Sequence, residues 1–132
     1  MSQDNIEVVW RMNAAFNRGN LDEAYGFYEP TAVWHSRADE PDTGDYHGLD
    51  AIREMAMMWV GMFDEFRFDL EDYVDGGDWV VTSGWLCGRG RESGAEVRER
   101  YAWVVRLRGG KLAEIWEYRD RAQALEAVGL SE

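Results

Sequence analysis

The stretch WVVTSGWLCGRGRESGAEVRERYAWVVRLRGGKLAEIWEYR, from Trp79 to Arg119, decides the fold, because it predicts three long strands in succession. Valine, tryptophan and tyrosine recur through residues 79–91, 96–108 and 111–119, and such residues favour strands. Turns around Gly94 and at Gly109 and Gly110 join these strands as hairpins. More glycines interrupt the first strand, where they mark bends that curl a sheet; they are Gly84, Gly88 and Gly90.

Amphipathic helices and two shorter strands precede this stretch, and one helix follows it. Apolar residues at helical spacing predict helices over residues 6–16, 20–29, 50–63 and 120–128. Asn20, Asp50 and Asp120 can cap the last three of these helices. Residues 31–36 and 66–71 are predicted strands, and residues 37–44 are a predicted loop. This order predicts an α+β fold, in which a curved antiparallel sheet wraps on helices and forms a cone with an internal pocket.

Length and composition set limits on the function. A chain of 132 residues suits a single domain, and its 7 Trp, 6 Tyr and 5 Phe can line a hydrophobic pocket as well as a core. The net charge of −12 argues against nucleic acid and anionic membranes as partners. Cys87 is the single cysteine, so no internal disulfide can form. No signal peptide or membrane span is visible, so a cytoplasmic protein is expected.

Three strings carry a family resemblance that runs over nearly the whole chain. They are FNRGNLDEAYGFYEPTAVWHS from Phe16, YHGLDAIREM from Tyr46 and RGGKLAEIWEYRDRAQALEAVGL from Arg108. With the order of elements, they resemble the SnoaL-like proteins of the nuclear transport factor two-like superfamily. The resemblance implies one domain over residues 1–132, a cystatin-like α+β roll and a homodimer formed through the outer face of the sheet. The superfamily holds isomerases, dehydratases, epoxide hydrolases, polyketide cyclases and proteins without known catalysis.

The catalytic residues of two well-known relatives are missing from this chain. Ser36 stands where ketosteroid isomerase has its aspartate base, and Met12 stands where that enzyme has a tyrosine donor. Gly84 and Leu86 replace the arginine and aspartate on the long strand of limonene epoxide hydrolase. The resemblance therefore implies the fold of these enzymes without their mechanisms.

The resemblance also indicates which strand faces line the pocket. Side chains two residues apart share a face, so matching positions in the relatives place alternate residues of three strands on the pocket side. Tyr118 would reach the pocket only if its strand were bulged. The predicted substrate-binding residues are Trp34, Ser36, Trp59, Tyr101, Trp103, Tyr118 and Arg119.

Glu117 is the first candidate for a catalytic residue. It lies between Trp116 and Tyr118 in a strand that should be buried. A carboxylate in an apolar site has a raised pKa and can act as a general acid or base near neutral pH. The alternative is a structural ion pair with Arg119, which shares its face two residues on.

Glu99 and His35 are the other catalytic candidates. Glu99 shares a strand face with Tyr101 and Trp103, although it could instead be an exposed residue bridged to a neighbouring arginine. His35 titrates near neutral pH, but its parity in the strand points it away from the pocket. No cofactor motif is present, and no metal is expected, since His35, Asp45 and His47 lack a recognised ligand spacing.

Three functions remain open. The first is a cofactor-free acid–base enzyme of the isomerase, dehydratase, cyclase or hydrolase type, acting on a small, apolar, oxygenated molecule. The second is a non-catalytic protein that binds such a molecule in the same pocket. The third is an interaction module whose pocket is filled by its own tryptophans.

Overall fold

The computed structural model of the chain describes residues 2–37 and 44–130. Its helices are α1 (Ser2–Asn17), α2 (Leu21–Tyr25), α3 (Leu49–Met62) and α4 (Arg121–Ala127). Its strands are β1 (Tyr28–His35), β2 (Asp45–His47), β3 (Phe63–Asp75), β4 (Trp79–Gly90), β5 (Glu96–Arg108) and β6 (Lys111–Tyr118). No helix among these described residues is long and apolar enough to cross a membrane.

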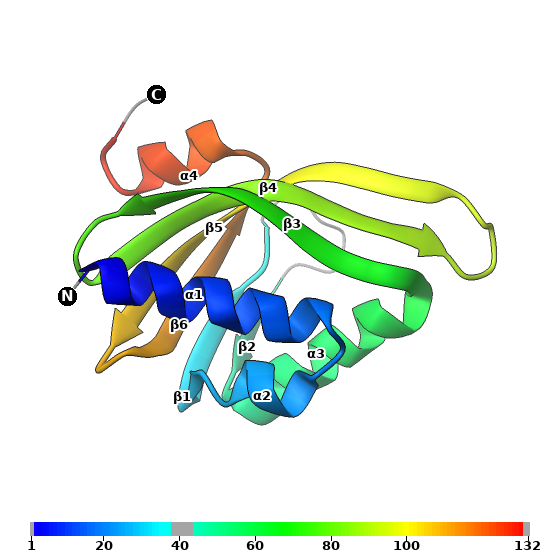
Figure 1. Cartoon of the computed structure of the whole chain (residues 1–132), viewed down its shortest axis with the longest axis horizontal. Helices are drawn as coiled ribbons and strands as arrows, with labels where there is room; N and C mark the ends of the chain where they lie inside the picture. Colours follow the sequence, from blue (N-terminus) through cyan, green and yellow to red (C-terminus); the bar gives the residue numbers. More distant parts are fainter. Residues whose placement is uncertain (1, 38–43, 131–132) are drawn as a thin grey trace.

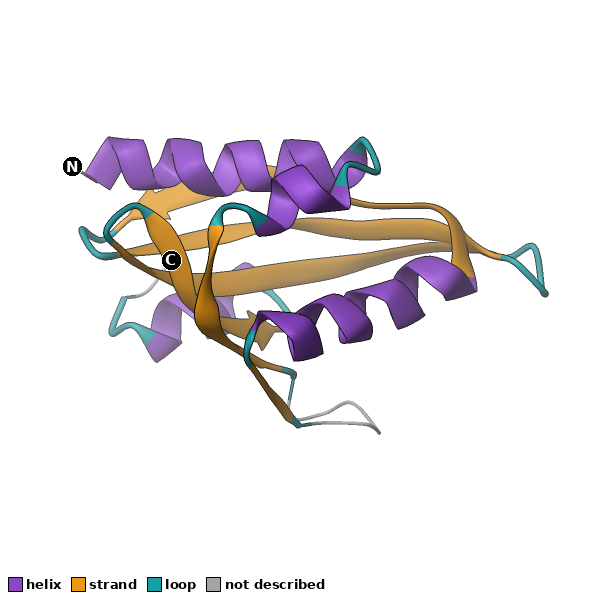
Figure 2. Ribbon diagram, turned by 90° about the horizontal axis from the view of Figure 1, so that it is seen from below, coloured by secondary structure: helices purple, strands orange, loops and turns teal. Residues whose placement is uncertain are grey.

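The strands form one curved sheet in the order β2-β1-β6-β5-β4-β3 (Figure 1). All neighbouring strands are antiparallel except β1 and β6, which run parallel. α1 and α3 cover the concave face, and α4 lies on the opposite face, as Figures 1 and 2 show together. The predicted α+β architecture, a curved sheet wrapped on helices, is confirmed; the sheet stays open, and one of its strand pairs is parallel.

Two layers of core follow from the alternation of side chains along β4 and β5. Val80 pairs with Val105, and both point into the main core between the sheet and helices α1 to α3. Val81 pairs with Val104, and both pack into a smaller core beneath α4. Because both faces of these central strands are covered, their apolar residues run almost without interruption. The pocket side of the sheet is therefore the face that α1 and α3 cover.

A bulge at the start of β3 sets the aromatic wall of the concave face. The pairing of β3 with β4 shifts between Asp64 and Arg67, and Glu65 has a φ of 56°, in the left-handed region. The extra residue brings the rings of Phe63 and Phe66 together, with their centroids 5.4 Å apart. Phe63 itself has an extended backbone and pairs with Gly90 on β4, so β3 begins there and α3 ends at Met62, whereas the sequence pattern predicts Phe63 in the helix.

Two further predicted boundaries differ from the structure. α2 ends at Tyr25, and Pro30 lies inside β1 rather than beyond a helix. The pairing of β1 with β6 is interrupted between Tyr28 and Val33, so the proline removes no regular ladder hydrogen bond there. The short strand β2, which pairs with the end of β1, was not predicted. Most of the predicted loop at 37–44 lies outside the described residues.

Candidate functional site

An internal cavity of about 50 Å³ lies between the concave face of the sheet and the helices. That volume exceeds the space that a single buried water needs, roughly 10–15 Å³. The tryptophans therefore do not fill the pocket completely. Aromatic rings make up most of its wall, from Phe16, Tyr25, Tyr28, Trp34, Trp59, Phe66, Phe68, Tyr101 and Trp103, and the other lining residues are Met12, Asn13, Ile52, Met55, Ala56, Leu86 and Glu117.

Strand register brings the key side chains of the cavity together. Trp103 on β5 lies directly opposite Glu117 on β6. Trp34 on β1 pairs with Ile115, two residues before Glu117 on the same face of β6. Directly opposed residues in a sheet have neighbouring side chains, so the two indoles and the carboxylate form one cluster. The rings of Trp34 and Trp103 meet edge to face, with their centroids 5.8 Å apart.

Glu117 is the one acidic residue in the cavity wall. Its exposed fraction is 9%. Among the described residues, no lysine, arginine or histidine lines this cavity, whereas His35, Arg37 and Arg119 line a neighbouring depression that Glu117 also reaches. The indole Nε1–H of Trp34 donates a hydrogen bond of 2.5 Å to Glu117 Oε1. This bond fixes the position of the carboxylate in the apolar cavity. In such surroundings the electrostatic interactions and hydrogen bonds of the carboxylate with a bound molecule are stronger than in water.

Tyr25 and Tyr28 are site residues that sequence analysis missed. Their rings lie 5.2 Å apart, and the hydroxyl of Tyr28 donates a weak hydrogen bond to Met12 Sδ at 3.9 Å. Burial raises the pKa of Tyr25 to about 12, and it raises the pKa of Tyr28 well above its usual value. Both phenols therefore stay protonated and can donate hydrogen bonds. The sequence did carry a signal for Tyr28, because Tyr28 and Trp34 have the same parity in β1 and therefore lie on the same face.

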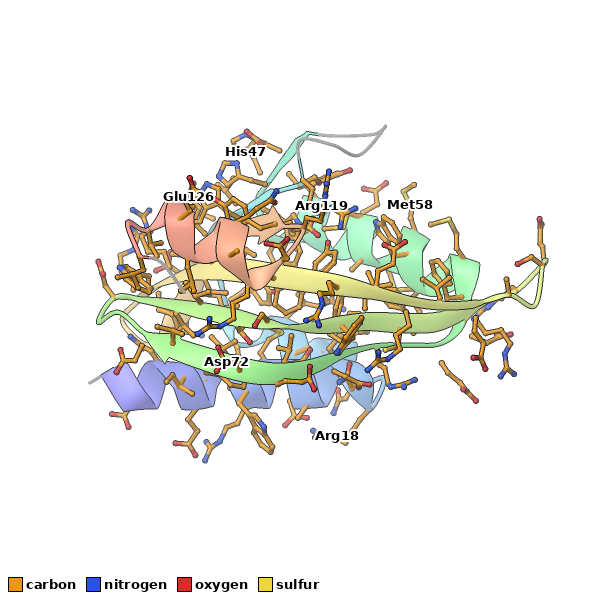
Figure 3. All side chains as sticks on the ribbon, turned by 90° about the horizontal axis from the view of Figure 1, so that it is seen from above. Arg18, His47, Met58, Asp72, Arg119 and Glu126 are labelled. Atoms are coloured by element: carbon orange, nitrogen blue, oxygen red, sulfur yellow. The ribbon has the colours of Figure 1, made fainter. Side chains whose placement is uncertain are left out.

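Five predicted site residues lie outside this cavity, and four of them line a second space. Ser36, Tyr118 and Arg119 line a separate, more polar depression at the ends of β1 and β6, together with His35. Figure 3 shows Arg119 close to α4, which covers the convex side of the sheet. Glu117 lines both spaces, so it lies between the polar depression and the aromatic cavity.

Glu99 does not reach the cavity. It is exposed on β5, where it pairs with Leu86, although it has the same parity as Tyr101 and Trp103. The cavity wall on β5 begins at Tyr101, and Glu99 lies beyond it toward the end of the long β4–β5 hairpin. Strand parity gives the face of the sheet on which a side chain lies, but it carries no information about how far along the strand a cavity extends.

His35 joins three strands outside the cavity. Its Nδ1 lies 2.8 Å from Asp45 Oδ1 on β2, and its Nε2 lies 2.6 Å from Glu114 Oε2 on β6. The ring also stacks on Trp116, with centroids 5.1 Å apart. Burial alone would lower the pKa of His35, but the hydrogen bonds with Glu114 and Asp45 outweigh it and leave the pKa raised. This geometry gives His35 a structural role between β2 and β6.

We expect His35→Gln to destabilise the fold more at low pH than at high pH. A raised pKa means that the charged imidazole stabilises the fold below its unfolded pKa of about 6.5, and that this stabilisation is lost as pH rises through the folded pKa. The loss should be about 1 kcal/mol at about pH 5.5 and smaller at about pH 9, as measured by urea unfolding. His47→Gln is the control, since His47 is exposed on β2 (Figure 3). An equal loss at both pH values would contradict the assignment.

Metal binding finds no support in the part of the chain that the structure describes. Within residues 2–37 and 44–130, no group of three or more His, Cys, Asp and Glu side chains could hold a metal ion. Cys87 is buried in β4 on the outer side of the sheet, with its thiol 3.6 Å from Asp69 Oδ2. Burial raises the pKa of this thiol, which disfavours a thiolate nucleophile.

Comparison with known proteins gives one family and many structures of the same fold. A family model described as a SnoaL-like domain matches residues 9–115. No curated protein sequence matches the chain. A protein from Burkholderia thailandensis described as NTF2-like shares 26% identity, with a TM-score of 0.78 over 88% of this chain and 90% of that one.

Two more distant structures share the fold. A protein from Catenulispora acidiphila, described as having a ketosteroid isomerase-like fold and solved in complex with trimethylamine, is 17% identical, with a TM-score of 0.76 over 94% of this chain and 93% of that one. A candidate SnoaL-like polyketide cyclase from Mesorhizobium loti is 16% identical, with a TM-score of 0.69 over 86% of this chain and 97% of that one. At these identities the likeness establishes the fold alone.

Proposed function

The chain belongs to the SnoaL-like domain family, and from that premise we propose that it binds a small, apolar, oxygenated molecule in the aromatic cavity and moves a proton with Glu117. The observation that carries the proposal is the position of Glu117, which among the described residues is the one carboxylate in a wall that is otherwise aromatic, aliphatic or neutral and polar. Such a cavity favours a ligand with a hydrocarbon body, and the carboxylate is the group that can exchange a proton with that ligand.

The proposed chemistry needs no cofactor. Glu117 would accept a proton from a carbon or hydroxyl group of the ligand and return it at another position. The phenols of Tyr25 and Tyr28 are neutral donors in the same wall and would stabilise negative charge that develops on a ligand oxygen. Isomerisation, dehydration and cyclisation all use such steps. One fold neighbour is described as a candidate SnoaL-like polyketide cyclase, and cyclisation is among the proposed reactions.

The second candidate function is binding without catalysis in the same cavity. The contact between Trp34 and Glu117 favours it, because a carboxylate that already accepts a hydrogen bond is a weaker base. The trimethylamine complex of the Catenulispora protein also supports a small organic ligand in this fold. The two functions differ in one respect: only the first predicts that the protein transfers protons to and from what it binds. The homodimer through the outer sheet face stays a prediction for either function.

The test is a screen of small cyclic ketones, enones and alcohols, followed by NMR in heavy water. We expect the wild type to bind members of this panel and to catalyse deuterium exchange at the carbon next to the carbonyl. Exchange reports proton transfer directly, so the natural substrate need not be known. Binding without exchange would favour the second function, and no binding by any member would contradict both.

Ala56→Leu locates the binding in the cavity. Ala56 lies on α3 in the cavity wall, and three added carbon atoms would occupy much of a space of about 50 Å³. We expect the affinity for every bound panel member to fall at least about tenfold, while the fold stays as stable as the wild type, because filling a cavity adds contacts. Met58→Leu is the control, since Met58 is 67% exposed on the same helix (Figure 3). Unchanged affinity in Ala56→Leu would place the ligand elsewhere.

A further inference from the structure

The indole nitrogen of Trp103 is a buried donor that has no acceptor among the residues the structure describes. Trp103 lines the cavity and is 2% exposed, and within the described residues its Nε1–H has no hydrogen-bond partner. Trp34 is the natural comparison, because its Nε1–H donates to Glu117 from the same wall. Buried polar groups are almost always hydrogen-bonded, so an exception in a cavity wall points to a partner that arrives from outside the chain.

The position of Trp103 in the cavity wall indicates which kind of molecule carries the missing acceptor. Trp103 and Glu117 are direct neighbours across β5 and β6, so one small molecule can contact both the carboxylate and the indole. An N–H donor requires an acceptor, and an oxygen is the acceptor that a small neutral molecule most readily offers. We infer that Trp103 is a specificity-determining residue, which donates its Nε1–H to a carbonyl or hydroxyl oxygen of the ligand.

This inference rests on the proposed function and narrows it. A hydrocarbon of the right shape would fill the cavity and leave the Trp103 donor without a partner, whereas a ketone or alcohol would satisfy it. Sites that hold a buried donor discriminate strongly against analogues lacking the matching acceptor. Trp103 would therefore set the choice of an oxygenated ligand, while Glu117 performs the proton transfer.

One contact within the protein competes with this explanation. The ring of Phe68 lies against Trp103, with centroids 4.7 Å apart and an angle of 60° between the planes. An indole N–H that points at an aromatic face gains a weak interaction. Such a contact would make Trp103 a packing residue with no preference for oxygen. The two explanations predict different responses to a matched pair of ligands.

The experiment compares cyclopentanone with methylenecyclopentane, in which a CH2 group replaces the oxygen and the shape is kept. In ¹⁵N-labelled wild type, the indole signal of Trp103 is identified by its absence in Trp103→Phe. We expect cyclopentanone to move this signal downfield and methylenecyclopentane to leave it unshifted or move it upfield. Trp103→Phe should lower the affinity for cyclopentanone about fivefold to tenfold more than the affinity for methylenecyclopentane, the range expected for one hydrogen bond. Trp59→Phe, a control in the same wall, should affect both probes equally.

Each outcome decides the matter. Equal losses for both probes in Trp103→Phe, with no downfield shift in the wild type, would overturn the role of Trp103 and leave ligand binding and proton exchange intact. Failure of both probes to bind the wild type at millimolar concentration would count against the cavity itself, and so against the proposed function as well. If Trp103→Phe does not fold, the signal is assigned by selective labelling, and the shift in the wild type decides alone.

Discussion

Glu117→Gln is expected to slow deuterium exchange of a bound ketone by a factor of about 10² to 10⁴, the usual contribution of a general acid or base. The amide keeps the shape of the carboxylate, and its oxygen can still accept the hydrogen bond from Trp34. The variant should therefore fold and bind ligands of the same size. What it loses is the proton-accepting oxygen, so the loss should appear in the rate of exchange rather than in ligand affinity.

Glu99→Gln is the matched control for this variant. It makes the same chemical change in the same sheet, but Glu99 is exposed and lies outside the cavity wall. Its exchange rate should equal that of the wild type. Full exchange in Glu117→Gln would exclude Glu117 as the catalytic group. A change in affinity without any exchange in the wild type would identify a binding protein that uses the carboxylate only as an acceptor.

Much of the fold could be predicted because local patterns decide it. The alternation in β4 to β6 and the glycine turns between them set the hairpins. Matching positions in the relatives, together with strand parity, placed Trp34, Trp103 and Glu117 on one face. The parallel pairing of β1 with β6 could not be predicted in this way. This pairing joins segments about 80 residues apart, and no local pattern in either segment indicates which strand it pairs with.

The site was predicted less completely than the fold, for two physical reasons. Tyr28 was assigned to a helix because Pro30 ends helices, yet a proline is also tolerated where the pairing of a strand is interrupted. Glu99 was assigned to the pocket because its parity is correct, although a cavity has limits along a strand that parity does not express. The missing acceptor of Trp103 depends on how the neighbouring rings pack, which only coordinates reveal.

Gly84→Ala is expected to destabilise the fold by about 3 kcal/mol or more, a large part of the roughly 5–15 kcal/mol that holds a domain together. A Cβ atom at this position would lie 2.0 Å from the carbonyl oxygen of Asp69 and 2.8 Å from the Cα of Leu70, both on β3. These backbone atoms cannot turn aside as a side chain can, so the edge strand β3, on which α1 packs, would have to move away from β4.

Gly88→Ala is the control for this effect, because it adds the same methyl group to the same strand. Its Cβ would lie 3.2 Å from the Cβ of Phe63, a side chain that can shift slightly, so the cost should stay below about 1 kcal/mol. Urea unfolding of both variants measures the difference. Similar stabilities for Gly84→Ala and Gly88→Ala would mean that the close approach of β3 and β4 at Gly84 is not required. A large loss in Gly84→Ala alone would show that β3 and β4 must approach closely at this glycine, which lies opposite Leu70 on β3 and opposite Tyr101, a residue of the cavity wall, on β5.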